Sequence, residues 1–334
     1  MIVTHKKITP GYFGKLPNFS DFIKYNAAGE ELLTFDKWIQ EGMLNSKSKF
    51  KDNWEEIYKN SPSYNFLYNY QGTENFLAGN LFPSKDKSNR LYPFLTTMKF
   101  DKSYIADDQF FQVPLVLKSF SEKMLKVYDF GVNSSISKDL NDFVENSDFE
   151  FDVFDRMRDE YKEYLNKIEF ECFWDRVLDK PDENQKLIII NNLFLFSSSN
   201  NTNSGSQRLN STVPFAIKFP LSHESIYYFL DAAFWIHLFL NICRRSNNKL
   251  TPEIVSLIWS YPDPKNFNSL FIIIGKLSPE YFSELINSGY SGNNSIDIKI
   301  NYDKEEELNY IPPGYKTMFG DEYITLSDFL NSIV

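Results

Sequence analysis

The chain has 334 residues, of which 17% are aromatic, and it carries a formal net charge of −10 at pH 7. This length suits one large domain or two, and a disordered chain would lack so many aromatic side chains. The acidic balance repels phosphate backbones and argues against nucleic acid as a partner.

The two cysteines and the N-terminal sequence indicate the cellular compartment of the protein. Cys172 and Cys243 lie at unrelated positions, which is not a disulfide framework and fits a reducing compartment. We expect both to be buried structural residues. Residues 1–15 have neither a long apolar core nor a small-residue cleavage site, so they do not resemble a secretory signal. A cytoplasmic location is the expectation.

The first hundred residues predict strands around one long helix. A helix is expected over residues 33–44 with Thr34 as its N-cap. Its apolar residues recur at spacings of three and four and share one face: Phe35, Trp38, Ile39 and Met43. A further helical turn is expected over residues 54–58. Strands are predicted at residues 12–13, 64–67, 76–81 and 91–100, with Pro93 near a strand start or edge.

The middle of the chain reads as mostly helical. Helices are predicted at residues 120–127, 140–144 and 154–178, because apolar residues alternate there with charges. Residues 187–196 and 271–274 are near-continuous apolar runs, which suit central strands covered on both faces. The polar tract between residues 197 and 211 is expected to be a loop.

In the last third of the chain, predicted strands and helices alternate again. A strand is predicted at residues 213–221, and helices are predicted at residues 222–243, 252–259, 279–286 and 326–333. Pro252 and Pro279 suit first helical turns, with Ser278 as a cap. Glu305, Glu306 and Glu307 are expected to be a solvated acidic run.

The apolar segment of residues 226–243 approaches the length of a bilayer span. Asp231 lies inside it, and an acid at the centre of a span costs about 2.5–3.5 kcal/mol. We expect a buried helix of a water-soluble protein with no membrane span. Membrane association through this segment is the alternative.

Together these elements predict an α/β protein, a three-layer α/β/α sandwich with a mixed sheet and additional helices. Residues 1–125 form an N-terminal portion. Residues 126–334 form a C-terminal α/β portion with helical elaboration, packed on the same core.

No catalytic or metal site emerges from spacing. The glycines of Gly11-Tyr12-Phe13-Gly14-Lys15 have two residues between them where a phosphate-binding loop needs four, so Gly14 is interpreted as turning the chain and Pro17 as fixing its exit. His and Cys lack ligand spacing, and no nucleophile elbow is present. We expect no cofactor and no metal.

The loop of residues 83–90 is the strongest candidate for function. Lys85, Lys87 and Arg90 surround Asp86 in the sequence, and Asn89 tolerates a left-handed conformation. Ser84 and Asp86 can bond backbone N–H groups and hold a turn. The loop is either a plain hairpin turn or a rigid cationic knuckle for an acidic or phosphorylated partner.

Three blocks of sequence, GYFGKLPNFSDFIKYN, FDKWIQEGM and LFPSKDKSNRLYPF, follow one another in the order of a known family pattern. The chain thereby resembles the TagF family of type VI secretion accessory proteins. Asn89 stands where the family has Gly, and Phe94 where it has Leu. The residues that carry the signature and could form contacts are Gly14, Lys15, Pro17, Asp21, Trp38, Pro83, Ser84, Asp86, Arg90 and Pro93.

The resemblance implies a three-layer fold and a non-enzymatic, cytoplasmic role in tuning apparatus assembly by protein–protein contact. Secretion components are the implied partners, in some systems through a forkhead-associated scaffold protein. We expect Lys15, Asp21 and loop 83–90 to lie together, with Lys15 and Asp21 as a pair. The alternative is an enzyme or binding module for a phosphorylated or acidic ligand, with Lys85, Asp86 and Arg90 as its polar residues.

Overall fold

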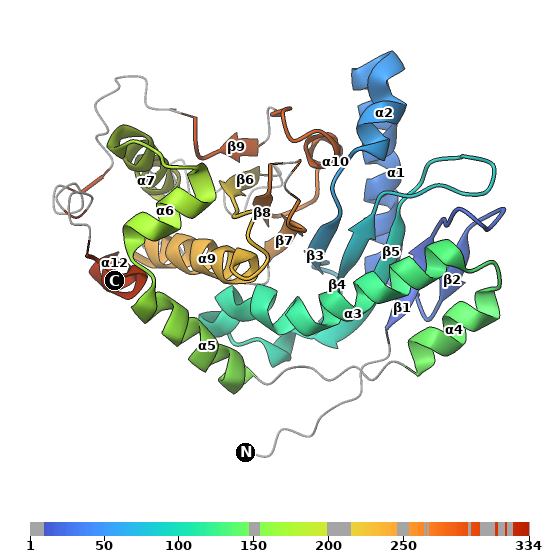
Figure 1. The fold of residues 1–334 in the computed structure, drawn as a ribbon, viewed down its shortest axis with the longest axis horizontal. Coiled ribbons are helices and arrows are strands. Elements are labelled where there is room, and N and C mark those ends of the chain that lie inside the picture. The colour runs from blue at the N-terminus through green and yellow to red at the C-terminus, as the bar shows by residue number, and fades with distance from the viewer. Residues whose placement is uncertain are drawn as a thin grey trace.

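The computed structural model describes residues 10–146, 154–198, 215–245, 254–263, 265, 267–292, 295–300, 311–312, 318 and 323–333 (Figure 1). The strands are β1 (Gly11–Gly14), β2 (Ile23–Tyr25), β3 (Tyr64–Asn69), β4 (Asn75–Phe82), β5 (Phe94–Asp101), β6 (Phe215–Pro220), β7 (Val255–Ser260), β8 (Ser269–Ile274) and β9 (Ser295–Asp297). The helices are α1 (Glu30–Phe50), α2 (Trp54–Lys59), α3 (Val113–Asn133), α4 (Ser137–Glu145), α5 (Phe154–Lys167), α6 (Phe170–Leu178), α7 (Glu183–Ser198), α9 (Tyr228–Arg245), α10 (Pro279–Ile286) and α12 (Leu326–Ile333). The protein is therefore of the mixed α/β class, as predicted.

The strands form one mixed sheet of nine strands in the order β2-β1-β5-β4-β3-β7-β8-β6-β9. Neighbours are antiparallel except β6 and β9, which are parallel. At the centre, β3 pairs with β7, and Leu67 lies opposite Leu257. Strands from the first hundred residues and strands from beyond residue 214 therefore share one backbone hydrogen-bond network.

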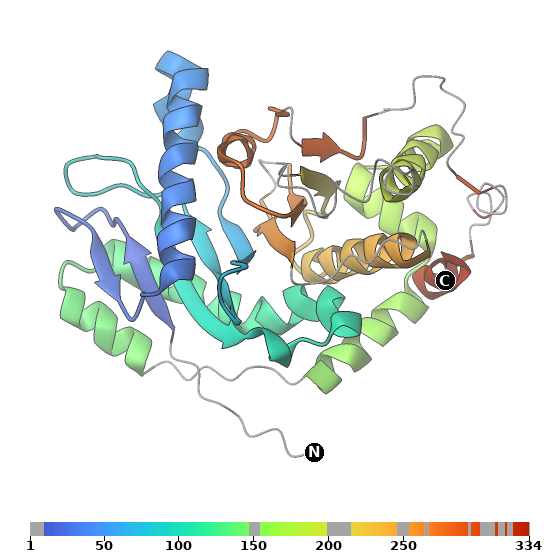
Figure 2. The ribbon, with the colours of Figure 1, turned by 180° about the vertical axis from the view of Figure 1, so that it is seen from behind.

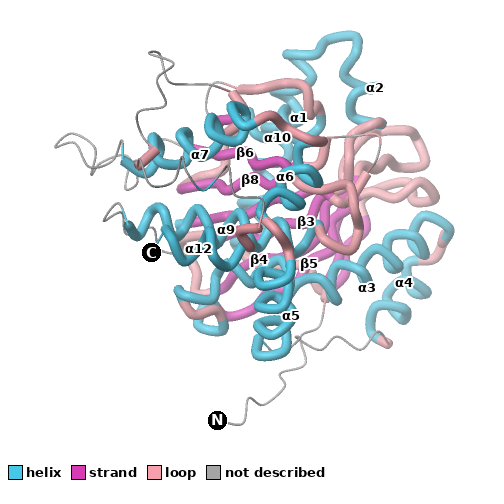
Figure 3. The backbone as a smooth tube through the Cα atoms, turned by 60° about the vertical axis from the view of Figure 1, so that its left-hand side comes forward, coloured by secondary structure: helices cyan, strands magenta, loops and turns pink. Residues whose placement is uncertain are grey.

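Each face of the sheet carries its own hydrophobic cluster, because successive strand side chains point to opposite sides. In β3, Phe66 packs with α1 and α10, whereas Leu67 packs in the larger cluster with α3 and α9. Helices accordingly lie on both sides of the strands (Figure 3). The view from behind shows α1 across the strands of the N-terminal half (Figure 2).

The helix predicted over residues 33–44 is longer and begins earlier, at Glu30. The prediction that Thr34 is the N-cap is wrong, because Gly29, with φ of 118°, occupies that position. Two acidic residues in the first turn favour the earlier start, since they face the positive end of the helix dipole. The buried stripe of Phe35, Trp38 and Ile39 is confirmed.

The C-terminal helices largely follow their sequence signals. The Ser278 hydroxyl accepts a hydrogen bond from the Glu280 N–H and caps α10, whose first residue is Pro279. The helix of residues 326–333 has the predicted bounds. The long apolar segment forms α9, and among the described residues no helix has the length and apolar character needed to cross a bilayer.

The strand predicted at residues 187–196 is wrong, because this run lies in α7. Its apolar residues are buried or half-buried on several sides, so the helical period is hidden in the sequence. The start of the helix carried a signal. Asp182 and Gln185 form a reciprocal cap, in which each backbone N–H donates to the other's side chain, at 2.8 and 3.0 Å.

The helix predicted through Trp259 is also wrong, because Val255–Ser260 is the central strand β7. Pro252, which suggested a helix start, lies outside the described residues. Every residue of β7 is buried, and its serines accept main-chain N–H bonds. The Asn69 N–H donates to Ser256 Oγ at 3.0 Å, and the Ser269 N–H donates to Ser260 Oγ at 2.9 Å.

The helical stretch predicted over residues 154–178 is divided into α5 and α6. The chain opens at residues 168–169 to pair with the segment that precedes α12. There the Phe170 N–H donates to the Ile324 carbonyl at 2.7 Å, and the Leu326 N–H donates to the Ile168 carbonyl at 3.0 Å. Most of the tract predicted as a loop at residues 197–211 and the acidic run at residues 305–307 lie outside the described residues.

Gly42 fixes the spacing between α1 and α10, and its replacement tests their contact. A Cβ atom at Gly42 would lie 2.3 Å from Phe282 Cβ. We expect Gly42→Ala to lower the free energy of unfolding by about 1–3 kcal/mol through overpacking, although alanine favours a helix. Chemical denaturation measures this. Ser48→Ala on the exposed side of α1 is the control, and equal stabilisation by both changes would contradict the packing.

Candidate functional site

A buried carboxylate, Asp86, organises the loop between β4 and β5. Its Oδ1 accepts the backbone N–H groups of Ser88 and Arg90, both at 2.9 Å. Its Oδ2 accepts Arg90 Nε at 2.7 Å and lies 3.1 Å from Lys15 Nζ. We call Lys15, Asp86 and Arg90 the Asp86 cluster. The turn predicted around Asp86 is confirmed.

Local backbone geometry brings these residues together. Strand β1 ends at Gly14 with φ of 136°, where a Cβ atom would lie 2.2 Å from the Pro93 carbonyl oxygen. Only glycine permits this approach, and it sets Lys15 beside the loop. Asn89 has φ of 62°, the left-handed conformation that the sequence predicted. The isolated bridge between Lys85 and Leu91 closes the loop.

Lys15 and Asp21 do not form the predicted pair, because Lys15 reaches the buried Asp86 carboxylate instead. Asp21 is exposed and accepts the Phe22 N–H. Arg90 joins the two loops: its Nη2 donates to the Ser20 carbonyl at 2.7 Å and lies 3.9 Å from Asp21 Oδ1. The expectation that Lys15, Asp21 and loop 83–90 lie together is confirmed, with different partners.

The electrostatics keep Asp86 ionised. Burial alone would raise the pKa of the Asp86 carboxyl, but hydrogen bonds from the Arg90 backbone N–H, Lys15 and the Arg90 guanidinium outweigh it and lower the pKa to about 2. The side chain of Asp86 is fully buried, and that of Lys15 is 8% exposed. Such a charge needs its partners, because an unpaired buried ion is costly.

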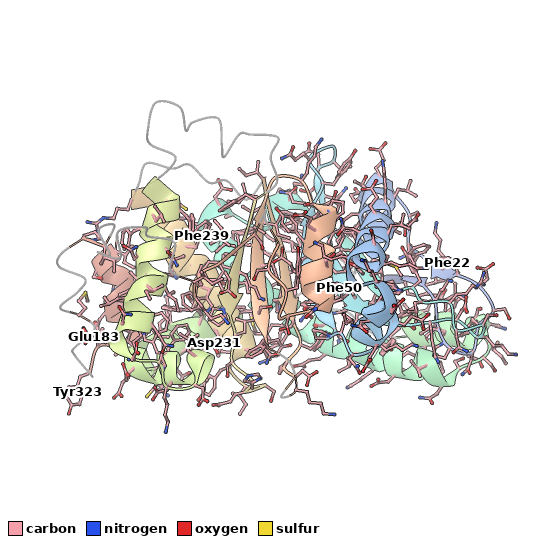
Figure 4. All side chains as sticks on the ribbon, turned by 90° about the horizontal axis from the view of Figure 1, so that it is seen from above. Phe22, Phe50, Glu183, Asp231, Phe239 and Tyr323 are labelled. Carbon is pink, nitrogen blue, oxygen red and sulfur yellow. The ribbon has the colours of Figure 1, made fainter. Side chains whose placement is uncertain are left out.

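An exposed surface lies directly over the Asp86 cluster. The Phe22 ring stacks on Phe13 at 5.4 Å between centroids and meets Tyr92 edge-on at 4.8 Å, yet it remains 43% exposed. Lys15 Nζ lies 5.0 Å from its centroid. Figure 4 shows Phe22 at the outer end of the molecule. We call six exposed residues of the two loops the knuckle face: Asp21, Phe22, Lys87, Ser88, Asn89 and Arg90.

The remaining signature residues have structural surroundings. Trp38 is buried away from the Asp86 cluster, where its Nε1 donates to the Ser278 carbonyl at 2.8 Å. Ser84 is buried, its N–H donates to Tyr58 OH at 3.2 Å, and its carbonyl accepts the Tyr92 N–H at 3.1 Å. The prediction that the Ser84 side chain holds the turn is wrong, because its hydroxyl accepts no backbone N–H among the described residues. Pro83 and Pro17 are half-buried, and Pro93 is buried. That these residues take part in contacts with a partner protein stays a prediction.

Sequence reasoning missed the main-chain acceptors that join the two loops. The Phe19 carbonyl accepts the Lys87 N–H at 2.8 Å, and the Ser20 carbonyl accepts Arg90. Carbonyl groups occur at every residue, so no sequence signal could single these out. Asp36 and Tyr92, both part of the family pattern, also turn out to be hydrogen-bonded to each other.

A second buried ion pair was also missed. Arg176 Nη2 lies 2.6 Å from Asp231 Oδ1, and Tyr164 OH donates to the same oxygen at 2.7 Å. Burial raises the pKa of Asp231, while Arg176 and Tyr164 oppose the shift. Asp231 lies inside the molecule (Figure 4), and Arg176 also borders a cavity of about 520 Å³. The acid within the apolar helix is thus paired.

The described part of the chain has few side chains suited to metal binding or to thiol chemistry. No group of three or more His, Cys, Asp or Glu side chains there could hold a metal ion. Cys243 is buried as expected, but Cys172 is exposed, which corrects the prediction for it. Partial burial and the nearby Glu169 carboxylate raise the pKa of the Cys172 thiol, which disfavours the nucleophilic thiolate.

Comparison with known proteins supports the resemblance. Residues 11–137 match the family model described as TagF N-terminal domain, Type VI secretion system-associated. The chain therefore carries a TagF-type N-terminal domain over these residues. A search of curated proteins found no match.

One similar solved structure is the crystal structure of PA0076 from Pseudomonas aeruginosa PAO1, at 12% identity and a TM-score of 0.48. The likeness covers 85% of this chain and 96% of that chain.

Replacing the buried carboxylate tests the Asp86 cluster. Asp86→Asn leaves Lys15 without its counter-charge and sets an amide N–H against cationic donors. We expect the free energy of unfolding to fall by about 3–5 kcal/mol, measured by chemical denaturation. The exposed Asp52→Asn should change it by less than about 0.5 kcal/mol. Equal midpoints for the two variants would show that the ion pair does not stabilise the fold.

The low pKa of Asp86 predicts acid sensitivity. Because its pKa is lowered in the folded state, the contribution of Asp86 to stability is complete above the ordinary value of 3.8 and is lost as pH falls toward about 2. Denaturation midpoints should therefore fall less steeply between pH 4 and 2 in Asp86→Asn than in the unaltered chain. Glu163 and Asp328 also have lowered pKa values, but they are present in both the variant and the unaltered chain, so their contribution to the pH dependence of stability is the same in both. Parallel curves would contradict the assignment.

Proposed function

We propose that this protein is a cytoplasmic accessory protein of a bacterial type VI secretion system that tunes apparatus assembly by protein–protein contact. The single observation that carries this proposal is the match of residues 11–137 to the TagF N-terminal domain. In this proposal the protein needs no cofactor and catalyses no reaction. Secretion components are its partners, with a forkhead-associated scaffold protein as one candidate.

The architecture of the knuckle face favours contact. Two loops that are separate in sequence are joined through Arg90 to the Ser20 carbonyl and through the Lys87 N–H to the Phe19 carbonyl. The exposed groups of this face are thus held in place before a partner arrives. A preorganised surface loses less conformational entropy on binding, so more of the contact energy appears as affinity.

A phosphorylated or acidic ligand at loop 83–90 is the second candidate, favoured by the exposed Lys87 and Arg90. Much of Arg90 is already engaged by Asp86 and the Ser20 carbonyl, and Lys85 Nζ donates to Asn89 Oδ1 at 2.7 Å. Asp86 is buried with a pKa of about 2, far from the value a general base needs near neutral pH. These contacts suit a binding surface better than a catalytic one.

We interpret the helices on both sides of the sheet as the three-layer α/β/α sandwich predicted from the sequence. We also keep the division into an N-terminal portion, residues 1–125, and a C-terminal portion, residues 126–334, on a shared sheet. The pairing of β3 with β7 supports the shared sheet.

Charge reversal at Lys87 tests the knuckle face. Its side chain is exposed, and only its main-chain N–H bonds across the loops, so Lys87→Glu should leave the fold intact. We expect the tagged variant to recover secretion components from cells carrying the apparatus at less than about one tenth of the unaltered level, because like charges replace attraction at a contact. Quantitative pull-down is the measurement.

Lys162→Glu on α5, which lies apart from β1 and β2 (Figure 1), makes the same charge change at an exposed side chain and should bind normally. If Lys87→Glu recovers secretion components at the normal level, the knuckle face does not take part in the contact. The proposed function itself would fail if the unaltered protein recovers no secretion component and its deletion leaves sheath assembly and effector release unchanged.

A further inference from the structure

The two outermost strands at one end of the sheet, β1 and β2, have helices over one of their faces. On that face Tyr12 and Ile23 belong to the cluster that packs with α3, and the Tyr12 hydroxyl donates to Asn141 of α4. Phe13 points to the other face, toward the cluster of α1. Seen from behind, β1 and β2 lie beside α1 and not beneath it (Figure 2). Within the described part of the chain, no helix covers this second face.

We call Phe13, Phe22 and Lys24 the open sheet face. Phe13 and Lys24 are directly opposite each other in the pairing of β1 with β2, and the Phe22 ring stacks on Phe13. Phe22 is 43% exposed, and Lys24 is exposed. A single exposed apolar side chain is ordinary on a protein surface. This ring, however, is held between Phe13, Tyr92 and the Lys15 ammonium, so it presents a fixed apolar surface to solvent.

The dimensions of the open sheet face suit a helix. Helix α1 packs against β3 and β4, and β1 lies two strands beyond β4 in the sheet. Neighbouring strands are about 4.8 Å apart, which places β1 roughly 10 Å from β4. Helices that pack side by side have axes about 8–10 Å apart. A helix in ordinary contact with α1 would therefore lie over β1 and meet Phe13 and Phe22.

Charge indicates what kind of helix fits. The knuckle face together with Lys24 holds three exposed cations, Lys24, Lys87 and Arg90, and one exposed acid, Asp21, on a chain whose net charge is −10. A second copy in a symmetric contact would set these cations against their own equivalents. Residues 1–9 carry two lysines and no acid, so like charges also disfavour them as the cover. An acidic partner is the complementary choice.

We propose that the open sheet face and the knuckle face receive an acidic amphipathic helix of a partner protein, which lies beside α1 and over β1. An apolar side chain of this helix contacts Phe22, and its carboxylates face Lys24, Lys87 and Arg90. Arginine and aromatic side chains are the usual anchors of such contacts, and guanidinium groups match carboxylates in geometry. The inference rests on the contact function proposed above and specifies which part of the partner makes the contact.

Photo-cross-linking from position 22 identifies the occupant. The full chain with Phe22→p-benzoylphenylalanine is produced in cells carrying the apparatus, irradiated and analysed by tandem mass spectrometry. We expect a cross-link to a segment of a secretion component with net negative charge and apolar residues at spacings of three and four, the pattern of an amphipathic helix. The same amino acid in place of Leu125, which is 38% exposed on α3, is the control and should not label that segment.

Two variants then measure the contact with the labelled segment as a synthetic peptide. We expect Lys24→Glu and Phe22→Ala each to raise the dissociation constant by about tenfold or more in fluorescence anisotropy. Lys162→Glu and Leu125→Ala make matched changes elsewhere and should bind as the unaltered chain does. Because Lys24 is exposed and lies outside loop 83–90, its variant keeps the test valid if Phe22→Ala fails to fold, and it separates the open sheet face from that loop.

The outcomes distinguish this inference from the proposed function. If the unaltered protein recovers secretion components but position 22 labels none of them, the proposed function stands and the inference fails. Labelling of residues 1–9, of a second copy, or of a segment without the acidic amphipathic pattern would also overturn it, as would unchanged peptide affinity in Lys24→Glu. If the unaltered protein recovers no secretion component, the proposed function and the inference fall together.

Discussion

The antiparallel pairing of β3 with β7 is the constraint on which the architecture depends. It joins residues 64–69 to residues 255–260 across nearly two hundred residues of intervening chain and places both strands at the centre of the sheet. Strands in that position have no solvent-facing side, so each face needs its own cover. The chain between β5 and β6 supplies α3 to α7, and α1 with α10 covers the opposite face.

Asp86 plays the corresponding role for the knuckle face. A carboxylate without solvent contact persists only when donors surround it, and here two main-chain N–H groups, Lys15 and Arg90 supply them. Because the same Arg90 continues to the Ser20 carbonyl, one buried charge aligns two loops. The exposed residues above it therefore form a defined shape, which is the property a protein-binding surface requires.

Elements with local signals were predictable. Proline in the first turn and a serine cap located α10, and a left-handed Asn89 and a glycine at the end of β1 were read from residue type alone. The two wrong elements both lie in segments that are largely buried on more than one side. Residues 187–196 became a helix and residues 255–260 a strand, because burial on several sides removes the periodicity that distinguishes the two. The reciprocal cap of Asp182 and Gln185 was the remaining clue for the helix.

By itself, the sequence determined the α/β class, the turn at loop 83–90 and membership of its first portion in a secretion-associated family, because these depend on residue type and order. The tertiary structure decided the partner of Lys15, which is Asp86 and not Asp21, the break between α5 and α6, and the open sheet face beside α1. The reason is physical: ion pairs, strand bridges and the cover of a sheet face are set by distances between segments remote in sequence, and those distances exist only once the sheet has brought the segments together.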